Sequence, residues 1–275
     1  MKCKIIAECA TNHRGNRALA RDMVLAARDC GCDAVKFQAW QVKNIKHPTP
    51  RDTERELSDA DLCSLKATAD RAGIGFLVSV FDEGRIDFVR NALGCREVKI
   101  PSQDLTAWGL LERCRDAFDF VYLSTGMSKP NEIKDAAEVL YKPDDPASFC
   151  LMHCVSKYPH GASDAHLRGI TTNSLYAHHV GYSDHTLGTA CAFHAIHKGI
   201  YAYEGHFALE KDPADPFAMA AKTPPEMRAI CEEAVATATR EGNPCRDLTP
   251  ADREMRWRWK NYRGENHGPD IMRTS

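Results

Sequence analysis

The sequence has 275 residues, 43% of them hydrophobic and 27% charged, a composition that excludes disordered and fibrous proteins. The 36 Lys and Arg residues nearly balance the 38 Asp and Glu residues, so the net charge of −2 gives no indication of nucleic-acid or anionic-membrane binding. No apolar run approaches the roughly 18 residues of a membrane span, and His13 and Arg14 follow the N-terminal apolar stretch too early for a signal peptide, so we expect a cytoplasmic protein.

Short runs of β-branched and aromatic residues alternate along the chain with longer stretches of helical period. Each run predicts a strand, and each longer stretch predicts a helix. The predicted strands are 4–9, 34–38, 75–80, 97–101, 120–125, 148–154, 179–184 and 201–209. The predicted helices are 17–30, 58–72, 83–92, 107–115, 130–141, 164–174, 189–197 and 224–240.

Eight alternating strand–helix units predict one α/β domain, a (β/α)8 TIM-type barrel over residues 1–240, with residues 241–275 as a short C-terminal extension. The alternative is an open, doubly wound sheet. That fold would lead us to expect a G-x-G-x-x-G turn after the first strand, and the turn over residues 10–16 reads ATNHRGN instead.

Twelve cysteines are scattered along the chain, and no two of them form a C-x-x-C pair. A chain of this length without a signal sequence does not need a disulfide framework. We therefore expect the cysteines to be reduced and most of them to be buried as small hydrophobic side chains.

Polar side chains end all eight predicted strands, which a purely structural barrel would not require. In TIM barrels the active site lies at the C-terminal ends of the strands. His185 and His206 end two neighbouring strands and could share a divalent metal, with two structural histidines as the alternative. Two lysines amid hydroxyls suit a phosphate dianion, with solvated rim positions as the alternative for each lysine. This second set comprises Lys36, Lys99, Ser79, Ser102, Ser124 and Ser183.

Eight motifs run in order across almost the whole predicted barrel. They are IIAECATNHRGN (5–16), DAVKFQ (33–38), FDEGRIDF (81–88), VKIPSQDLT (98–106), LSTGMS (123–128), LMHCVSKYP (151–159), VGYSDHTLG (180–188) and EGHFALEKD (204–212). With these motifs the chain resembles the N-acetylneuraminate (sialic acid) synthases, barrel enzymes that condense phosphoenolpyruvate in the biosynthesis of sialic-acid-like sugars. The combination of STGM, GYSDHT and the HF pair after the last strand is the most specific part of the resemblance.

The resemblance implies a divalent metal, Mn²⁺ or Mg²⁺, and condensation of phosphoenolpyruvate with a sugar or sugar-like aldehyde to a 3-deoxy-2-keto acid and phosphate. It implies His185 and His206 as metal ligands, and Glu8, Glu132, Lys36 and Lys99 as catalytic residues. The two lysines also belong to the implied phosphoenolpyruvate cradle, with Ser79, Ser102, Ser124, Ser156 and Ser183. Gln38 and Tyr158 are implied on the acceptor side, together with Glu8 and Glu132.

The sequence departs from the family pattern on the acceptor side. Gly205 stands where a lysine usually precedes the last-strand histidine, and the usual acceptor-facing aspartate is absent, with Asp215 out of register. The roughly 35 residues after the last predicted helix are too few for the family's antifreeze-like C-terminal domain. The acceptor therefore stays open between N-acetylmannosamine and a different aldehyde, such as a smaller sugar or a nucleoside-derived aldehyde.

The tail after residue 240 has two interpretations. Trp257 and Trp259 could pack against the bottom of the barrel, or a basic residue of the tail could reach the site in place of the missing domain. The basic candidates are Arg256, Arg258, Lys260 and Arg263.

Two other functions stay open at the level of sequence. One is an aldolase or lyase acting on a related keto acid, in which Lys36 or Lys99 would form a Schiff base. The other is a non-catalytic homologue that binds phosphate and metal. The predicted partners are small molecules, phosphoenolpyruvate and an aldehyde acceptor, without nucleic acid or membrane, and a homodimer through the barrels is one expected assembly.

Overall fold

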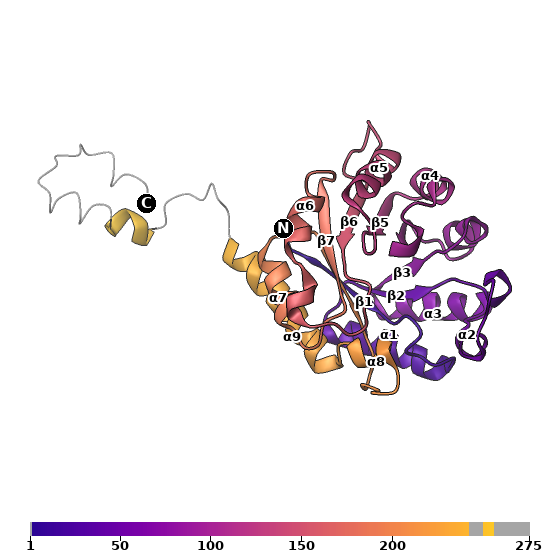
Figure 1. Ribbon diagram of the computed structural model, residues 1–275. Helices are drawn as coiled ribbons and strands as arrows, with labels where there is room; N and C mark the ends of the chain where they lie inside the picture. Colours follow the sequence, from indigo (N-terminus) through magenta and orange to yellow (C-terminus); the bar gives the residue numbers. More distant parts are fainter. Residues whose placement is uncertain (1, 242–249, 256–275) are drawn as a thin grey trace, which may run out of the picture. The chain divides into compact units, whose positions relative to one another are not determined.

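The computed structural model describes residues 2–241 and 250–255 (Figure 1). The chain divides into two compact units, Met1–Ala238 and Thr239–Ser275. In the first unit eight parallel strands close into one barrel, because β1 pairs with β8 in the register Glu8 to His206. The predicted (β/α)8 barrel is confirmed, and the open sheet is excluded. The tail residues from Arg256 onward lie outside the described residues.

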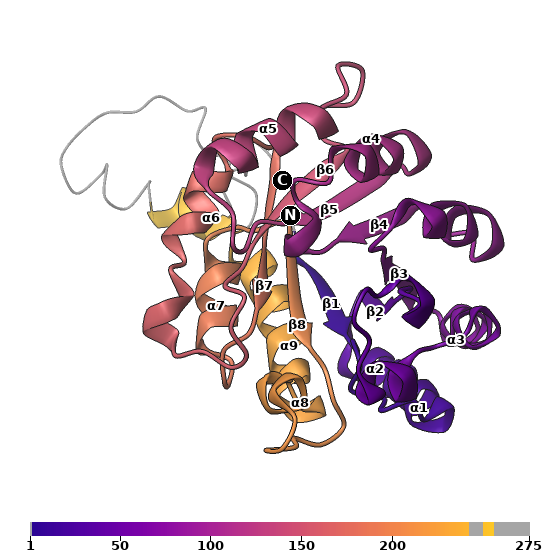
Figure 2. The same ribbon diagram turned by 45° about the vertical axis from the view of Figure 1, so that its right-hand side comes forward.

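The strands are short, and the helices surround them (Figures 1 and 2). The strands are β1 (Lys4–Glu8), β2 (Ala34–Gln38), β3 (Gly75–Ser79), β4 (Glu97–Ile100), β5 (Phe120–Ser124), β6 (Phe149–His153), β7 (His179–Asp184) and β8 (Ala202–His206). The helices are α1 (Arg17–Cys30), α2 (Pro50–Arg55), α3 (Asp59–Ala72), α4 (Trp108–Ala117), α5 (Pro130–Leu140), α6 (Arg168–Asn173), α7 (Ala190–His197), α8 (Pro216–Ala220) and α9 (Pro224–Glu241). Among the described residues, no helix has the length and apolarity to cross a membrane.

Two stretches that were predicted as continuous helices are each divided into two short segments, so these two predictions are wrong. The stretch 83–92 folds as two short turns, Glu83–Arg85 and Phe88–Ala92, and no side chain caps the start of either turn. The stretch 164–174 is likewise divided, because His166 adopts a left-handed backbone between two short helical segments. Two short helices, α2 and α8, were not predicted.

Local caps fix two of the helices that the sequence predicts well, α1 and α3. Asn16 accepts hydrogen bonds from two backbone N–H groups at the start of α1, and Gly31 ends that helix in a left-handed conformation. Ser58 and Asp61 form a capping box at the start of α3. These signals lie within a few residues of each helix end, which is why sequence alone located both helices.

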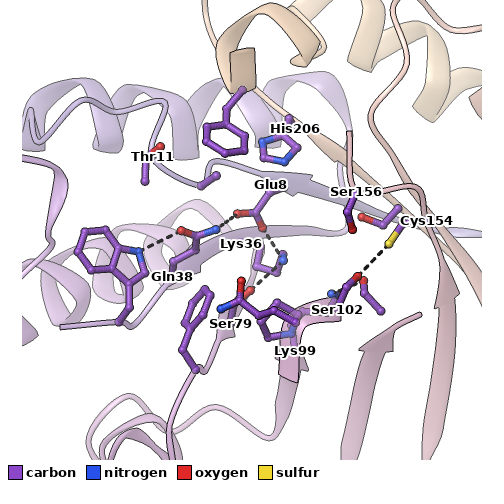
Figure 3. A pocket seen from close by; sticks show the side chains of 18 of the residues that line it. Glu8, Thr11, Lys36, Gln38, Ser79, Lys99, Ser102, Cys154, Ser156 and His206 are labelled. Atoms are coloured by element: carbon purple, nitrogen blue, oxygen red, sulfur yellow. Dashed lines mark hydrogen bonds and ion pairs between the residues drawn. The ribbon is translucent and has the colours of Figure 1, made fainter. Parts of the chain in front are cut away.

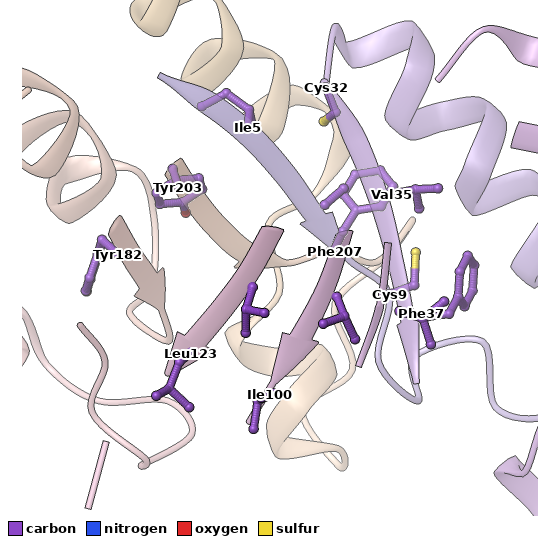
Figure 4. Close-up of a cluster of buried hydrophobic side chains, with 14 of the residues drawn as sticks. Ile5, Cys9, Cys32, Val35, Phe37, Ile100, Leu123, Tyr182, Tyr203 and Phe207 are labelled. Carbon is purple, nitrogen blue, oxygen red and sulfur yellow. The ribbon is translucent and has the colours of Figure 1, made fainter. Parts of the chain in front are cut away.

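Side chains alternate along each strand between the barrel interior and the helix layer. The outward side chains pack with the helices in the main hydrophobic core (Figure 4). The interior is apolar in the half near the strand starts, where the buried cluster consists of Ile6, Ala34, Leu77, Tyr122, Cys150, Met152 and Ala202. Two residues further along five of these strands, the buried residues are Glu8, Lys36, Ser79, Ser124 and Glu204. The barrel thus changes from an apolar to an ionic interior toward the C-terminal ends of its strands.

The structure describes eleven of the twelve cysteines, and all eleven are free. Ten of them are buried, and Cys63 is exposed. Cys32 and Cys231 approach most closely, with their sulfurs 3.8 Å apart.

Candidate active site

A cavity of about 710 Å³ opens at the C-terminal ends of the strands. Every predicted site residue except Glu132 lines it (Figure 3). These residues are Glu8, Lys36, Gln38, Ser79, Lys99, Ser102, Ser124, Ser156, Tyr158, Ser183, His185 and His206. Residues from all eight strands or the loops after them are therefore brought together at one place.

Lys36 lies at the centre of a buried ionic group and is only 3% exposed. Its Nζ is 2.6 Å from Glu8 Oε2 and 3.1 Å from Glu204 Oε2. It also donates a hydrogen bond of 2.9 Å to Ser79 Oγ. A buried ammonium needs such partners, because desolvation without them is very costly. Glu204 begins the EGHFALEKD motif, but the sequence assigned it no role.

Lys99 lies on the other side of the same carboxylate, 4.0 Å from Glu204 Oε1. It donates to Ser124 Oγ at 2.6 Å and to the carbonyl oxygen of Ile100 at 3.2 Å. Ser183 Oγ donates to Glu204 Oε1 at 3.0 Å. Glu204 is therefore held between two ammonium groups and a hydroxyl.

The two buried carboxyl groups differ in their protonation behaviour. Burial raises the pKa of Glu8, and the neighbouring negative charge of Glu204 raises it further, although Lys36 opposes the shift. Burial also disfavours ionised Glu204, but Lys36 and Lys99 outweigh that effect and lower its pKa. Of the two, Glu8 is therefore the carboxyl group better suited to hold or release a proton, while Glu204 stays ionised.

A second set of donors lies beside Lys99. The backbone N–H of Gly126 donates to Ser102 Oγ at 3.1 Å, and that hydroxyl lies 3.1 Å from Cys154 Sγ. A Cβ at position 126 would stand 2.5 Å from Ser156 Oγ and 2.9 Å from Ser102 Oγ. The glycine of the STGM motif is thus required by the close approach of the backbone to these hydroxyls.

His185 and His206 are neighbours, with ring centroids 5.4 Å apart. His185 Nδ1 lies 2.6 Å from the carbonyl oxygen of Val155, so Nδ1 carries the proton and Nε2 is left with a free lone pair. His206 Nδ1 is buried and has no hydrogen-bond partner among the residues that the structure describes. Burial lowers the pKa of His185 to about 4 and that of His206 well below its usual value, so both rings are neutral at pH 7.

The aromatic ring of Tyr158 packs against both histidines, with its centroid 4.0 Å from that of His185 and 5.4 Å from that of His206. Phe217 packs on the other side of the Tyr158 ring, at 4.8 Å. Within residues 2–241 and 250–255, no three His, Cys, Asp or Glu side chains gather as a ready-made metal site. Within this described part of the chain, two imidazoles could serve as metal ligands, and no third such side chain is grouped with them.

The outer part of the cavity is lined by side chains that sequence reasoning missed, apart from Gln38. Trp40 Nε1 donates to Gln38 Oε1 at 3.0 Å, which turns the Gln38 amide nitrogen toward Glu8 (Figure 3). Asn44 Nδ2 donates to Asp82 Oδ2 at 3.2 Å. Further lining residues here are Thr11, Gln41, Ile45, Asp52 and Phe81. Most of them lie in loops beyond the strand ends, where no periodic pattern indicates their position.

Glu132 does not reach the cavity. It lies in the first turn of α5, where its Oε2 accepts a 2.6 Å hydrogen bond from the backbone N–H of Lys129. Its carboxylate therefore caps the helix, and the catalytic role implied by the resemblance does not fit this position.

The two departures from the family pattern have structural explanations. A Cβ at position 205 would stand 2.7 Å from the Tyr203 hydroxyl, so Gly205 makes room for that side chain. Asp215 is buried outside the cavity lining, with Oδ1 2.5 Å from Arg51 and Oδ2 2.5 Å from Arg55. It therefore joins α2 to the start of α8 rather than facing a ligand.

Comparison with known proteins gives consistent matches over most of the chain. Residues 23–245 match the NeuB family. An N,N'-diacetyllegionaminic acid synthase from Legionella pneumophila is 32% identical over 277 residues, covering 93% of this chain and 77% of that protein. The N-acetylneuraminate-9-phosphate synthase of Homo sapiens is 28% identical, covering 91% and 74%. The crystal structure of the N-acetylneuraminic acid synthetase from Leptospira borgpetersenii, in complex with citrate, matches with a TM-score of 0.86 at 26% identity, covering 97% and 94%.

Proposed function

Because the chain belongs to the NeuB family, we propose that it condenses phosphoenolpyruvate with a sugar aldehyde, forming a 3-deoxy-2-keto acid and phosphate. Its relatives include synthases of N,N'-diacetyllegionaminic acid and of N-acetylneuraminate 9-phosphate, and the resemblance indicated by the motifs is confirmed. The observation that carries the proposal is a single cavity that joins two hydroxyl-lined lysines to a pair of neutral histidines.

The lysine end of the cavity supports the donor assignment. Phosphoenolpyruvate carries a phosphate and a carboxylate, and Lys36 and Lys99 with the surrounding hydroxyls offer the charge-assisted donors that such groups need. When C3 of phosphoenolpyruvate attacks the aldehyde carbon, positive character develops at C2, and water adds there. The tetrahedral intermediate then expels phosphate, whose charge the two ammonium groups stabilise.

Glu8 is the proposed acid–base group of this sequence of steps. Its Oε2 is paired with Lys36, whereas its Oε1 accepts only a weak hydrogen bond of 3.5 Å from Gln38 Nε2. The raised pKa lets this carboxyl group take the proton of the water that adds to C2. Lys36 has a raised pKa because its carboxylate partners outweigh burial, so it stays protonated. That charge state argues against Lys36 as a Schiff-base nucleophile.

The histidine pair fits a divalent metal. Both rings are neutral, the Nε2 of His185 is free, and the buried Nδ1 of His206 lacks a partner. We propose that these two residues would hold Mn²⁺ or Mg²⁺ and leave the remaining positions to water and substrate. The bound ion would supply Lewis-acid polarisation of the acceptor carbonyl.

The charge distribution supports an acceptor without phosphate. Among the described residues, the cations that line the cavity are Lys36 and Lys99 at its deep end, while Asp52 and Asp82 line the outer part. Arg51 and Arg55 are not among the residues that line the cavity, and both are ion-paired with Asp215. A phosphorylated sugar would place its phosphate against carboxylates, so we propose an acceptor recognised through hydroxyl or amide groups.

Phosphate release from phosphoenolpyruvate by metal-stripped protein tests this function. Mn²⁺ or Mg²⁺ is added back with a panel of hexosamines, N-acetylhexosamines and neutral aldoses, each paired with its 6-phosphate. We expect release that requires both metal and one unphosphorylated acceptor and that is lost in His185→Ala and His206→Ala. Preference for the phosphorylated member of a pair would refute the proposal of an acceptor without phosphate. Absence of phosphoenolpyruvate binding would refute the assignment of phosphoenolpyruvate as the donor.

A further inference from the structure

Behind the histidine pair lies an ion pair that the proposed chemistry does not use. Lys222 and Asp184 are both 0% exposed, and neither lines the cavity. Lys222 Nζ is 3.0 Å from Asp184 Oδ2 and donates a 2.6 Å hydrogen bond to the carbonyl oxygen of Thr186. A fully buried lysine is rare in proteins and costly to desolvate, so its presence at this position needs an explanation.

Asp184 has a full set of hydrogen-bond donors. Its Oδ1 accepts from the Tyr182 hydroxyl at 3.0 Å and from the N–H and hydroxyl of Thr186 at 2.8 and 2.7 Å. Its Oδ2 accepts from the Tyr203 hydroxyl at 2.9 Å, and the absent side chain of Gly205 leaves room for that ring. Figure 4 shows Tyr182 and Tyr203 on neighbouring strands. The orientation of the Asp184 carboxylate is therefore fixed from several sides.

Lys222 contacts the segments that carry both histidines. Its ammonium binds Asp184 and Thr186, the residues on either side of His185. Its backbone N–H donates to the carbonyl oxygen of His206 at 2.6 Å, and its own carbonyl accepts from Ala208 at 3.2 Å. One residue thus ties the end of β7 to the end of β8 at the positions from which the two imidazoles project.

We propose that Lys222 is a positioning residue that holds His185 and His206 at the separation a divalent metal requires. The inference rests on the proposed metal-binding role of the two histidines. Residues that orient metal ligands without touching the metal commonly change metal affinity by about 10- to 100-fold when replaced. An apolar residue of similar volume would fill the same space but would release the carbonyl of Thr186 and leave Asp184 without its cation.

The test is Lys222→Met, which keeps the length of the side chain and removes the ammonium. Mn²⁺ binding to the metal-stripped protein is measured by titration calorimetry, alongside metal-free phosphoenolpyruvate binding and thermal unfolding. We expect the Kd for Mn²⁺ to rise by about 10- to 100-fold, with phosphoenolpyruvate affinity within about twofold of wild type, since Lys222 lies outside the cavity lining. A purely structural role would lower the melting temperature without weakening Mn²⁺ binding relative to phosphoenolpyruvate binding.

Lys4→Met is the matched control, because Lys4 pairs with Glu97 at the opposite ends of the strands. It makes the same substitution in an ion pair and should leave Mn²⁺ affinity unchanged. If Lys222→Met does not fold, the double variant Asp184→Asn with Lys222→Met is used instead, because it removes both charges of the ion pair. It should still bind Mn²⁺ more weakly than the wild type, because the hydrogen bond from the Lys222 ammonium to the Thr186 carbonyl is lost.

If a folded Lys222 variant binds Mn²⁺ with unchanged affinity while His185→Ala and His206→Ala abolish binding, the positioning role of Lys222 is refuted and the proposed metal site stands. If the wild-type protein binds no Mn²⁺, or if the histidine variants bind it normally, the proposed metal site is wrong and the inference falls with it. A Mn²⁺ Kd that rises only in the Lys222 variants and the histidine variants supports both.

Discussion

Glu8 and Glu204 carry the same functional group, are both almost fully buried, and share the ammonium of Lys36. They differ because Lys99 is, after Lys36, the main cation that lowers the pKa of Glu204, whereas its effect on Glu8 is smaller and the charge of Glu204 raises the pKa of Glu8. The sequence predicts that both residues belong to strands, Glu8 to 4–9 and Glu204 to 201–209. It does not predict their pKa difference, because that depends on distances across the barrel between residues remote in the chain.

The donor assignment predicts the effect of replacing Lys99. In Lys99→Met the ammonium that donates to Ser124 is removed while the side-chain length is kept. A hydrogen bond to a charged group contributes roughly 1.5–3 kcal/mol, so we expect the Kd for phosphoenolpyruvate to rise by about 10- to 150-fold. Titration calorimetry of phosphoenolpyruvate binding, carried out without metal, measures this Kd. Lys66→Met, which breaks a surface pair with Asp70, is the control, and equal affinity in both variants would contradict the assignment.

His13 predicts a pH dependence of stability. The ring is 1% exposed, and burial lowers its pKa from 6.5 to about 4. Below pH 6.5 the unfolded chain binds a proton that the folded chain does not, so the free energy of unfolding falls with pH from 6.5 toward 4. Down to pH 5 this one group should account for roughly 2 kcal/mol.

Urea unfolding of the wild type and His13→Gln at pH 7.5 and 5.0 measures the contribution of His13. The variant should lose less stability between the two pH values, because it has no proton to take up at this position. The comparison at pH 7.5 gives the pH-independent cost of the substitution. An equal pH loss in both proteins would show that His13 is not held neutral in the folded state.

At the scale of elements, the helices that the sequence located, from α1 to α9, all have at least the eight residues of α7, and local caps mark the starts of two of them. Asn16 and Ser58 mark the starts of α1 and α3 within a single turn. The missed helices, α2 and α8, have six and five residues, too short for a periodic signal. They are joined by Asp215, which bonds Arg51 and Arg55 of α2 and also caps α8. A contact across about 160 residues of chain leaves no local pattern to recognise.

Asp215→Asn tests whether this contact shapes the acceptor end of the cavity. The change leaves Arg55, whose side chain is 13% exposed, without its anion, and removing one partner of a buried pair costs roughly 3–5 kcal/mol. Phe217 of α8 lines the cavity, so we expect a higher KM for the acceptor and an unchanged KM for phosphoenolpyruvate. Steady-state kinetics and urea unfolding measure both effects. Equal rises in the two KM values would contradict a role confined to the acceptor end.

At the scale of the whole molecule, closure of the barrel makes the first and last strands neighbours. The register of β1 with β8 places Glu8 opposite His206, although nearly 200 residues separate them in the chain. Alternation of strands and helices was enough to predict this closure, because eight such units in parallel favour a barrel. The same closure explains the ionic interior, since it brings together polar inward residues from five strands, namely Glu8, Lys36, Ser79, Ser124 and Glu204.

The barrel unit, Met1–Ala238, contains all eight strands and every described residue that lines the cavity. A chain that stops after Glu241 should therefore bind phosphoenolpyruvate with unchanged affinity and melt within about 4 °C of the full chain. Loss of phosphoenolpyruvate binding in a folded truncated protein would contradict a donor site built from the barrel alone.

The acceptor KM of the same truncated protein separates the two interpretations of the tail. A rise without a change in phosphoenolpyruvate affinity would favour a basic tail residue that reaches the acceptor, and the full chain carrying Arg256→Ala and Arg258→Ala should then show part of the same rise. An unchanged KM would exclude such a residue. The acceptor would then have to be held by the amides and carboxylates of the outer cavity, because the two lysines are committed to the donor.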